Sequence, residues 1–155
     1  AVAAYAQVSQ PSAVRQPLDR VSLPMTQPAV TVRTDVPLAI AAALLTRHGV
    51  GQMPVVDAQG QLVGLLLRAD IYPTLESPSA TDWADRMALP VAEVMWTPVA
   101  SVTADTDIRR VAQVLLDIHL PGLPVVDDNG TLTGFVSRTD ILRAVANDPP
   151  LDVWG

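Results

Sequence analysis

The sequence predicts an α+β fold built from two consecutive β-α-β-β-α units. The first observation behind this is that the chain aligns with itself at an offset of 70 residues, without a gap, from Met25 to beyond Ile71. Pro-Val-Val-Asp at 54–57, for example, recurs at 124–127. The second observation is that short apolar runs alternate, in both halves, with segments whose apolar residues have helical spacing. Together these patterns indicate an internal duplication.

Each unit begins with a predicted strand, at residues 29–32 and again at 99–102, and a helix follows it. In the second unit this helix reaches about Ile118. Its apolar residues recur at the i, i+3, i+4 and i+7 positions of one face, namely Ile108, Val111, Ala112 and Leu115.

Local chemistry indicates where these helices begin. Asp35 and Asp105 are expected to be the N-caps, because a carboxylate can accept hydrogen bonds from the free amides of a first turn. Pro37 falls in the first turn of the first unit's helix, where its missing N–H does no harm.

Two strands and a closing helix complete each unit. The Val-rich runs MPVVD and LPVVD predict buried strands. The segments AQGQ and DNGT follow as turns, and Asn129-Gly130 is typical of a tight hairpin. LVGLLL and LTGFVS predict the next strands, and the closing helices are expected to start near Arg68 and Arg138.

The remaining segments set the domain boundaries. We place an N-terminal arm at 1–22, the first unit at 23–76, a linker at 77–90, the second unit at 91–147 and a tail at 148–155. The linker run DWADRMA is expected to form one or two helical turns. Trp154 is expected to dock on this chain or on a partner subunit, because a large aromatic seldom stays free.

Composition excludes several classes of function. The net charge is −6 and every basic residue is Arg, so no basic stripe is available for nucleic acid or for an anionic membrane surface. The chain has no Cys, which excludes disulfides and thiolate chemistry. No apolar run approaches the roughly 18–20 residues that a membrane span needs. We therefore expect a cytoplasmic protein without membrane insertion.

The repeated unit resembles the CBS domain, and the pair resembles a Bateman module. The resemblance rests on the β-α-β-β-α order, on LPVVD-x-x-G-x-L-x-G at 123–134 and on GFVSRTDI at 134–141, and it covers roughly 22–147. It implies two units packed about a pseudo-twofold axis with two clefts between them. It also implies a homodimer and a ligand such as AMP, ADP, ATP or S-adenosylmethionine in the clefts.

The resemblance also implies roles for individual residues. Asp140 and Asp70 would bind ribose, and Ser137, Arg138 and Thr139 would bind phosphate. The adenine pocket would be formed by Thr97, Pro98, Val99, Gly122 and Leu123. The chemistry is reasonable in itself, because an ionised carboxylate can accept both hydroxyls of a cis-diol. A hydroxyl and free amides at a helix start suit an anionic oxygen.

The first unit departs from this pattern, since Leu67 and Ala69 replace the hydroxyls of Ser137 and Thr139. We therefore expect the Asp140 cleft to be the better site. The pairs Gly51-Gln52 and Pro121-Gly122 stand where some relatives carry basic residues for several phosphates. AMP is accordingly favoured over ATP.

Other interpretations stay open at this point. Asp70 and Asp140 are also suited to capping a helix and doing nothing more. Trp83 and Trp96 fit packing better than base stacking, and His48 and His119 have no carboxylate spacing for a metal. No catalytic residues, nucleophile-base pair or glycine-rich phosphate loop appears, so an enzyme is not expected.

The leading hypothesis is a regulatory module for energy sensing that signals to an unidentified effector protein by a conformational change. The alternative is a CBS scaffold or interaction protein whose clefts hold no ligand.

Overall fold

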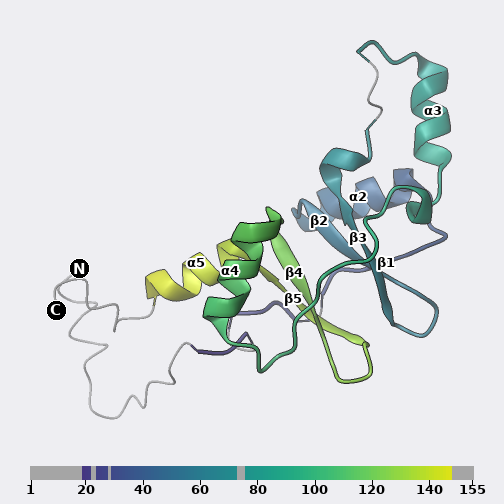
Figure 1. Ribbon diagram of the computed structural model, residues 1–155. Coiled ribbons are helices and arrows are strands. Elements are labelled where there is room, and N and C mark those ends of the chain that lie inside the picture. Colours follow the sequence, from purple (N-terminus) through teal and green to yellow (C-terminus); the bar gives the residue numbers. More distant parts are fainter. Residues whose placement is uncertain (1–18, 22–23, 28, 73–75, 148–155) are drawn as a thin grey trace, which may run out of the picture.

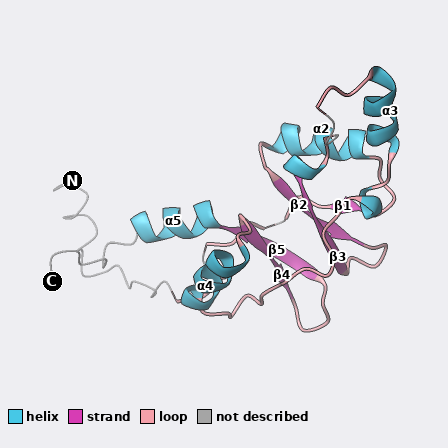
Figure 2. Ribbon diagram, turned by 45° about the horizontal axis from the view of Figure 1, so that its top comes forward, coloured by secondary structure: helices cyan, strands magenta, loops and turns pink. Residues whose placement is uncertain are grey.

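The computed structural model describes residues 19–21, 24–27, 29–72 and 76–147, and it has the predicted α+β architecture. The first unit contains β1 (Val32–Arg33), α2 (Leu38–His48), β2 (Gln52–Val56) and β3 (Leu62–Leu67). The second contains α4 (Ile108–Ile118), β4 (Gly122–Val126), β5 (Leu132–Ser137) and α5 (Arg138–Asn147). Figures 1 and 2 show the two sheets side by side, each with its own helices.

The two sheets follow one plan. β2 and β3 pair antiparallel, as β4 and β5 do, and the registers of the two pairs correspond at the 70-residue offset. β1 lies parallel to β2. The predicted strands at 29–32 and 99–102 are shorter than expected, because β1 has two residues and Val102 alone bridges Val125.

The first helices of the two units bury equivalent faces. The fully or nearly fully buried positions lie at i, i+3 and i+7 in both, and they are Leu38, Ala41 and Leu45 in α2 and Ile108, Val111 and Leu115 in α4. Burying an apolar side chain is the main favourable term in folding. The repeated spacing therefore explains why the same helix forms twice.

The predicted capping residues were wrong in both units. The N-cap of α4 is Asp107, whose carboxylate accepts from the Arg109 N–H at 2.7 Å, two residues beyond the predicted Asp105. Asp105 instead accepts from the hydroxyl of Thr103, and this hydrogen bond lowers the pKa of Asp105. The N-cap of α2 is Pro37, which makes no side-chain cap.

The closing helices differ between the units. The second unit has the predicted helix α5, whereas the first has only η1 (Arg68–Asp70), a single turn of 3₁₀ helix. The sequence supplies a reason, because Pro73 disfavours helical backbone in the residue before it and cannot donate an N–H.

Each unit receives a core residue from the other. Val21 is fully buried in the core formed by α4, β4, β5 and α5. Val91, 70 residues later, is fully buried in the core of the first unit. The backbone repeats the exchange, because the Val21 N–H donates to Thr106 O at 3.0 Å and the Val91 N–H donates to Val36 O at 2.9 Å. The segment that leads into each unit therefore completes the hydrophobic core of the opposite unit. Val21, in the segment predicted as an arm, is one of these core residues.

The exchanged segments also extend the opposite sheets. Thr26 and Phe135 donate to each other's carbonyl groups at 2.7 and 3.1 Å, which adds Thr26 to the edge of β5. Trp96 and Leu65 do the same at 2.8 and 3.0 Å, which adds Trp96 to β3.

The two hairpins meet at the pseudo-twofold axis. Gln61 bridges Thr131, its own counterpart in the repeat, and its Nε2 donates to Thr131 Oγ1 at 2.8 Å. The Leu62 N–H donates to Gly130 O, and the Leu132 N–H donates to Gly60 O. The reciprocal pattern confirms the packing of two sheets about a pseudo-twofold axis.

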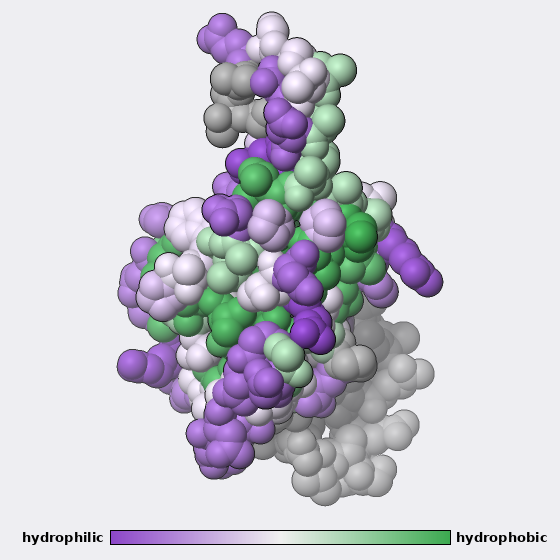
Figure 3. All heavy atoms as spheres, turned by 90° about the vertical axis from the view of Figure 1, so that its right-hand side faces the viewer, coloured by the Kyte–Doolittle hydropathy of each residue, from purple (hydrophilic) through white to green (hydrophobic). Residues whose placement is uncertain are grey.

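The linker forms a longer helix than predicted, α3 (Ala80–Ala88), and the second unit then begins with a 3₁₀ turn, η2 (Val91–Glu93). Ser79 and Asp82 form a reciprocal capping box, and the Ser79 N–H lowers the pKa of Asp82. Figure 3 shows the molecule narrowing towards this end, with hydrophobic areas interrupted by hydrophilic residues. No helix in the described part of the chain has the length and apolarity needed to cross a membrane.

One capping position allows a direct test of the repeat. His119 ends α4 with φ at 55°, and Gly49 ends α2 with φ at 64°. A side chain carries a steric cost in this left-handed region, which glycine avoids. We expect His119→Gly to stabilise the fold by roughly 0.5–1 kcal/mol in urea unfolding. The mirror change, Gly49→Ala, should destabilise it by about 1 kcal/mol. A loss of stability in His119→Gly would contradict the strain at this cap.

Candidate functional site

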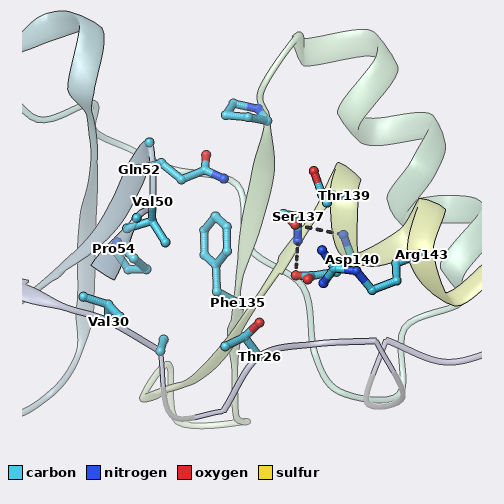
Figure 4. Close-up of a pocket in the computed structure, with 14 residues that line it drawn as sticks. Thr26, Val30, Val50, Gln52, Pro54, Phe135, Ser137, Thr139, Asp140 and Arg143 are labelled. Carbon is cyan, nitrogen blue, oxygen red and sulfur yellow. Dashed lines mark hydrogen bonds between the residues drawn. The ribbon is translucent and has the colours of Figure 1, made fainter. Parts of the chain in front are cut away.

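A pocket of about 460 Å³ lies between the two units. Figure 4 shows its residues pointing inward from both sheets and from the start of α5. From the first unit it is lined by Thr26, Ala29, Val30, Gly49, Val50, Gly51, Gln52 and Pro54. From the second it is lined by Pro121, Phe135, Ser137, Thr139, Asp140 and Arg143.

Ser137 and Asp140 are held in place by the start of α5. The Ser137 N–H donates to Asp140 Oδ2 at 2.9 Å, and the Asp140 N–H donates to Ser137 Oγ at 3.0 Å. This is the reciprocal geometry of a capping box, with Asp at the N3 position. The capping role considered from the sequence is therefore present, and it fixes both side chains at the wall of the pocket.

Capping leaves binding capacity unused. Asp140 accepts from Ser137 through Oδ2, and none of the described residues donates to its Oδ1. The Ser137 hydroxyl acts as an acceptor towards Asp140, so its own O–H remains available as a donor. Thr139 lines the same pocket and is exposed. One carboxylate oxygen and two hydroxyls can therefore reach a bound molecule.

The opposite side of the pocket is apolar. Figure 4 shows Val30, Val50 and Pro54 from the first unit facing Phe135 from the second. A flat ring that enters between them would bury both faces against carbon atoms, which is how proteins generally hold aromatic ligands. The valines and Pro54 come from the first unit, whereas Ser137 and Asp140 come from the second, so a ligand that contacts both sets would bridge the two units.

The cation of the pocket is Arg143, which the sequence analysis missed. Arg143 lines the pocket, and its spacing of three residues from Asp140 places both on one face of α5. That spacing was a usable signal. Arg138, predicted to bind phosphate, is instead directed towards α4, where its Nη2 donates to Leu115 O at 2.7 Å. Its counterpart Arg68 donates to Val50 O at 3.1 Å.

The five residues predicted to form the adenine pocket do not line the pocket at Asp140. They are Thr97, Pro98, Val99, Gly122 and Leu123. For residues 97–99 the exchange of leading segments gives the reason, since the segment that contains Trp96 pairs with β3 of the first unit. Ala29 and Gln52, which are the counterparts of Val99 and Gly122 in the repeat, take these places in the Asp140 pocket.

Gln52 of the first unit lies against Gly122 and Phe135 of the second. A Cβ atom on Gly122 would fall 2.5 Å from Phe135 Cε1 and 2.8 Å from Gln52 Nε2, so a larger residue would require these side chains to move. Gln52 Oε1 is buried and has no hydrogen-bond partner among the residues that the structure describes. The side chain thus brings an uncharged amide, rather than a cation, to the wall of the pocket.

The equivalent carboxylate of the first unit has a different environment. Asp70 Oδ2 accepts a hydrogen bond from the indole Nε1 of Trp96 at 2.6 Å. Leu67 and Ala69 stand beside it without a hydroxyl. Within the described residues, no cluster of three or more acidic or histidine side chains could hold a metal.

Comparison with known proteins gives consistent results. The family model of the CBS domain matches residues 19–76 and 91–147. Over 130 residues the chain is 28% identical to L-aspartate semialdehyde sulfurtransferase of Methanocaldococcus jannaschii. That match covers 84% of this chain and 24% of the relative, so the chain spans about a quarter of the relative's length.

Two solved structures share the fold over nearly their whole length. The crystal structure of CBSX2 in complex with AMP is 26% identical, with a TM-score of 0.70, and the match covers 82% of this chain and 96% of that one. The CBS domain pair of protein MJ0100, in complex with 5′-methylthioadenosine and S-adenosyl-L-methionine, is 28% identical with a TM-score of 0.71. That match covers 84% and 98% of the two chains.

The capping box at α5 predicts a loss of stability in Ser137→Ala. Removing an N-cap hydroxyl costs about 1 kcal/mol, and the Asp140 amide would lose its acceptor. Thermal unfolding should show a midpoint lowered by roughly 2–4 °C. Ser101→Ala, at an exposed serine outside any helix, should leave the midpoint unchanged. Equal midpoints for the two variants would contradict the capping role.

Proposed function

The chain belongs to the CBS domain family, and on that premise we propose that it is a regulatory module that binds one adenosine-containing ligand in the pocket at Asp140. One observation carries the proposal. A carboxylate oxygen without a described donor, two hydroxyls and one cation lie across the pocket from an apolar wall of the other unit. Catalysis is not part of the proposal, since the sulfurtransferase relative extends far beyond this chain.

The ribose of the ligand is assigned to Asp140. Its free Oδ1 can accept from a ribose hydroxyl, and Oδ2 retains acceptor capacity beside the Ser137 amide. The adenine ring would then lie between Phe135 and the valines at 30 and 50. Relatives support the class of ligand, because CBSX2 is described with AMP and MJ0100 with two other adenosine compounds.

The phosphate end favours a single phosphate group. Ser137 and Thr139 offer hydroxyl donors, and Arg143 offers the one cation among the residues that line the pocket. Gln52 and Gly51 add no charge on the opposite wall. A second or third phosphate would bring negative charge without an added cation, so AMP is preferred to ADP or ATP. S-adenosylmethionine also contains adenosine, so it remains a candidate ligand for this pocket.

The ligand would act by fixing how the two units sit against each other. It would contact both units, and a ligand shifts an equilibrium only if it binds one arrangement better than another. The changed arrangement would be passed to an effector protein, as in energy sensing, with a homodimer as the functional assembly. A cytoplasmic location agrees with a nucleotide ligand.

Thermal unfolding with and without AMP tests the site. AMP at about 100 times its dissociation constant should add about 2.7 kcal/mol to the free energy of unfolding. This corresponds to a rise of roughly 5–10 °C in the midpoint. Asp140→Ala should lose this rise, because no acceptor would remain for the ribose, while Asp70→Ala should keep it. If neither AMP, ADP, ATP nor S-adenosylmethionine shifts the ligand-free wild type, the scaffold alternative replaces this proposal.

The two arginines of the closing helix provide a second test. Arg143→Met should weaken AMP binding about tenfold or more, the usual effect of removing a hydrogen bond to a charged group. Adenosine, which lacks the phosphate, should bind Arg143→Met as it binds the wild type in titration calorimetry. Arg138→Met is the matched control, because its guanidinium caps a carbonyl of α4. AMP binding that depends on Arg138 and not on Arg143 would overturn the assignment.

A further inference from the structure

The repeat places different side chains at one equivalent position beside Asp140 and Asp70. Position 96 corresponds to position 26 at the 70-residue offset, and both are held by the same pair of backbone hydrogen bonds to the opposite unit. Thr26 lines the Asp140 pocket. Trp96 occupies the corresponding place beside Asp70. The difference between these two positions is therefore a short hydroxyl side chain against a large indole.

The indole makes the contact that a nucleoside would need. Trp96 Nε1–H donates to Asp70 Oδ2 at 2.6 Å, and a hydrogen bond to an ionised acceptor is among the stronger kinds. A ribose hydroxyl would donate to this same carboxylate. We propose that Trp96 is an intramolecular ligand of the first cleft, which limits the chain to one bound adenosine compound. This inference rests on the function proposed above and goes beyond it by assigning the number of sites.

Neighbouring residues hold both partners of this contact. The guanidinium of Arg86, on α3, donates to the carbonyl groups of Asp70 and Ile71 at 2.6 and 3.0 Å, which fixes the turn that carries Asp70. Trp96 is fixed through its backbone, yet its side chain is 54% exposed. The indole can therefore rotate away without opening a core.

The chemistry beside Asp70 also defines what an opened cleft would accept. Leu67 and Ala69 provide no hydroxyl where Ser137 and Thr139 serve the other pocket. The carboxylate remains as an acceptor for a cis-diol. An opened first cleft should therefore bind an uncharged nucleoside, such as adenosine, in preference to a nucleotide.

The test is the number of adenosine molecules bound per chain, measured by titration calorimetry for the wild type and Trp96→Ala. We expect the variant to bind one more molecule than the wild type. Trp83→Phe, which changes an exposed tryptophan on α3, should add none. The difference in the number of bound adenosine molecules between the variant and the wild type does not depend on the Asp140 pocket. A wild type that binds nothing would therefore contradict the proposed function alone. An equal number in wild type and Trp96→Ala would overturn the present inference.

A mirror variant and a spectroscopic measurement strengthen the test. Thr26→Trp would place an indole beside Asp140, and it should abolish the thermal shift given by AMP.

If Trp96→Ala does not fold, the indole ¹H–¹⁵N resonance of Trp96 replaces it as the readout. Adenosine added to the Thr26→Trp protein, whose other cleft is blocked, should move this resonance at high concentration as it competes for Asp70. A resonance unaffected by both adenosine and Asp70→Asn would overturn the inference.

Discussion

The exchange of leading segments is the constraint on which the rest of this structure depends. Val21 fills the core of the second unit, and Val91 fills that of the first. Full burial of such a side chain is worth roughly 1.5–3 kcal/mol relative to exposure. The same segments donate and accept backbone hydrogen bonds at the edges of the opposite sheets. Neither core is complete without the other unit, and the walls of the Asp140 pocket likewise belong to both.

The sequence predicted what depends on local pattern. The 70-residue offset located both β-α-β-β-α units, and the periodicity at Ile108 and Val111 located α4. Ser137, Thr139 and Asp140 were predicted together, and the structure places all three at one pocket. Short spacing explains why they lie together, because residues at a helix start stay close whatever the rest of the fold does.

What the sequence could not predict depends on contacts between distant residues. Nothing near Thr97 or Val99 in the chain indicates that the segment crosses to the opposite unit, so these residues were predicted for a pocket that they do not line. The cap at Asp107 was missed because Asp105 is an equally good candidate by composition, and only the bond from Thr103 distinguishes them. Arg143 is a different case, because its spacing of three residues from Asp140 does predict a place on the same face of the helix.

The exchange has a consequence for the unit considered by itself. A chain that contained only residues 91–147 would keep the helices and strands of the second unit, but it would lack Val21 and the strand residue at Thr26. Its own Val91 and Trp96 would extend away from the core with no partner. Two such chains could satisfy each other by trading these segments, with the same contacts that the duplicated chain makes internally. The repeating unit is thus half of an obligate pair, and the linker between the copies converts an association that depends on concentration into one that does not.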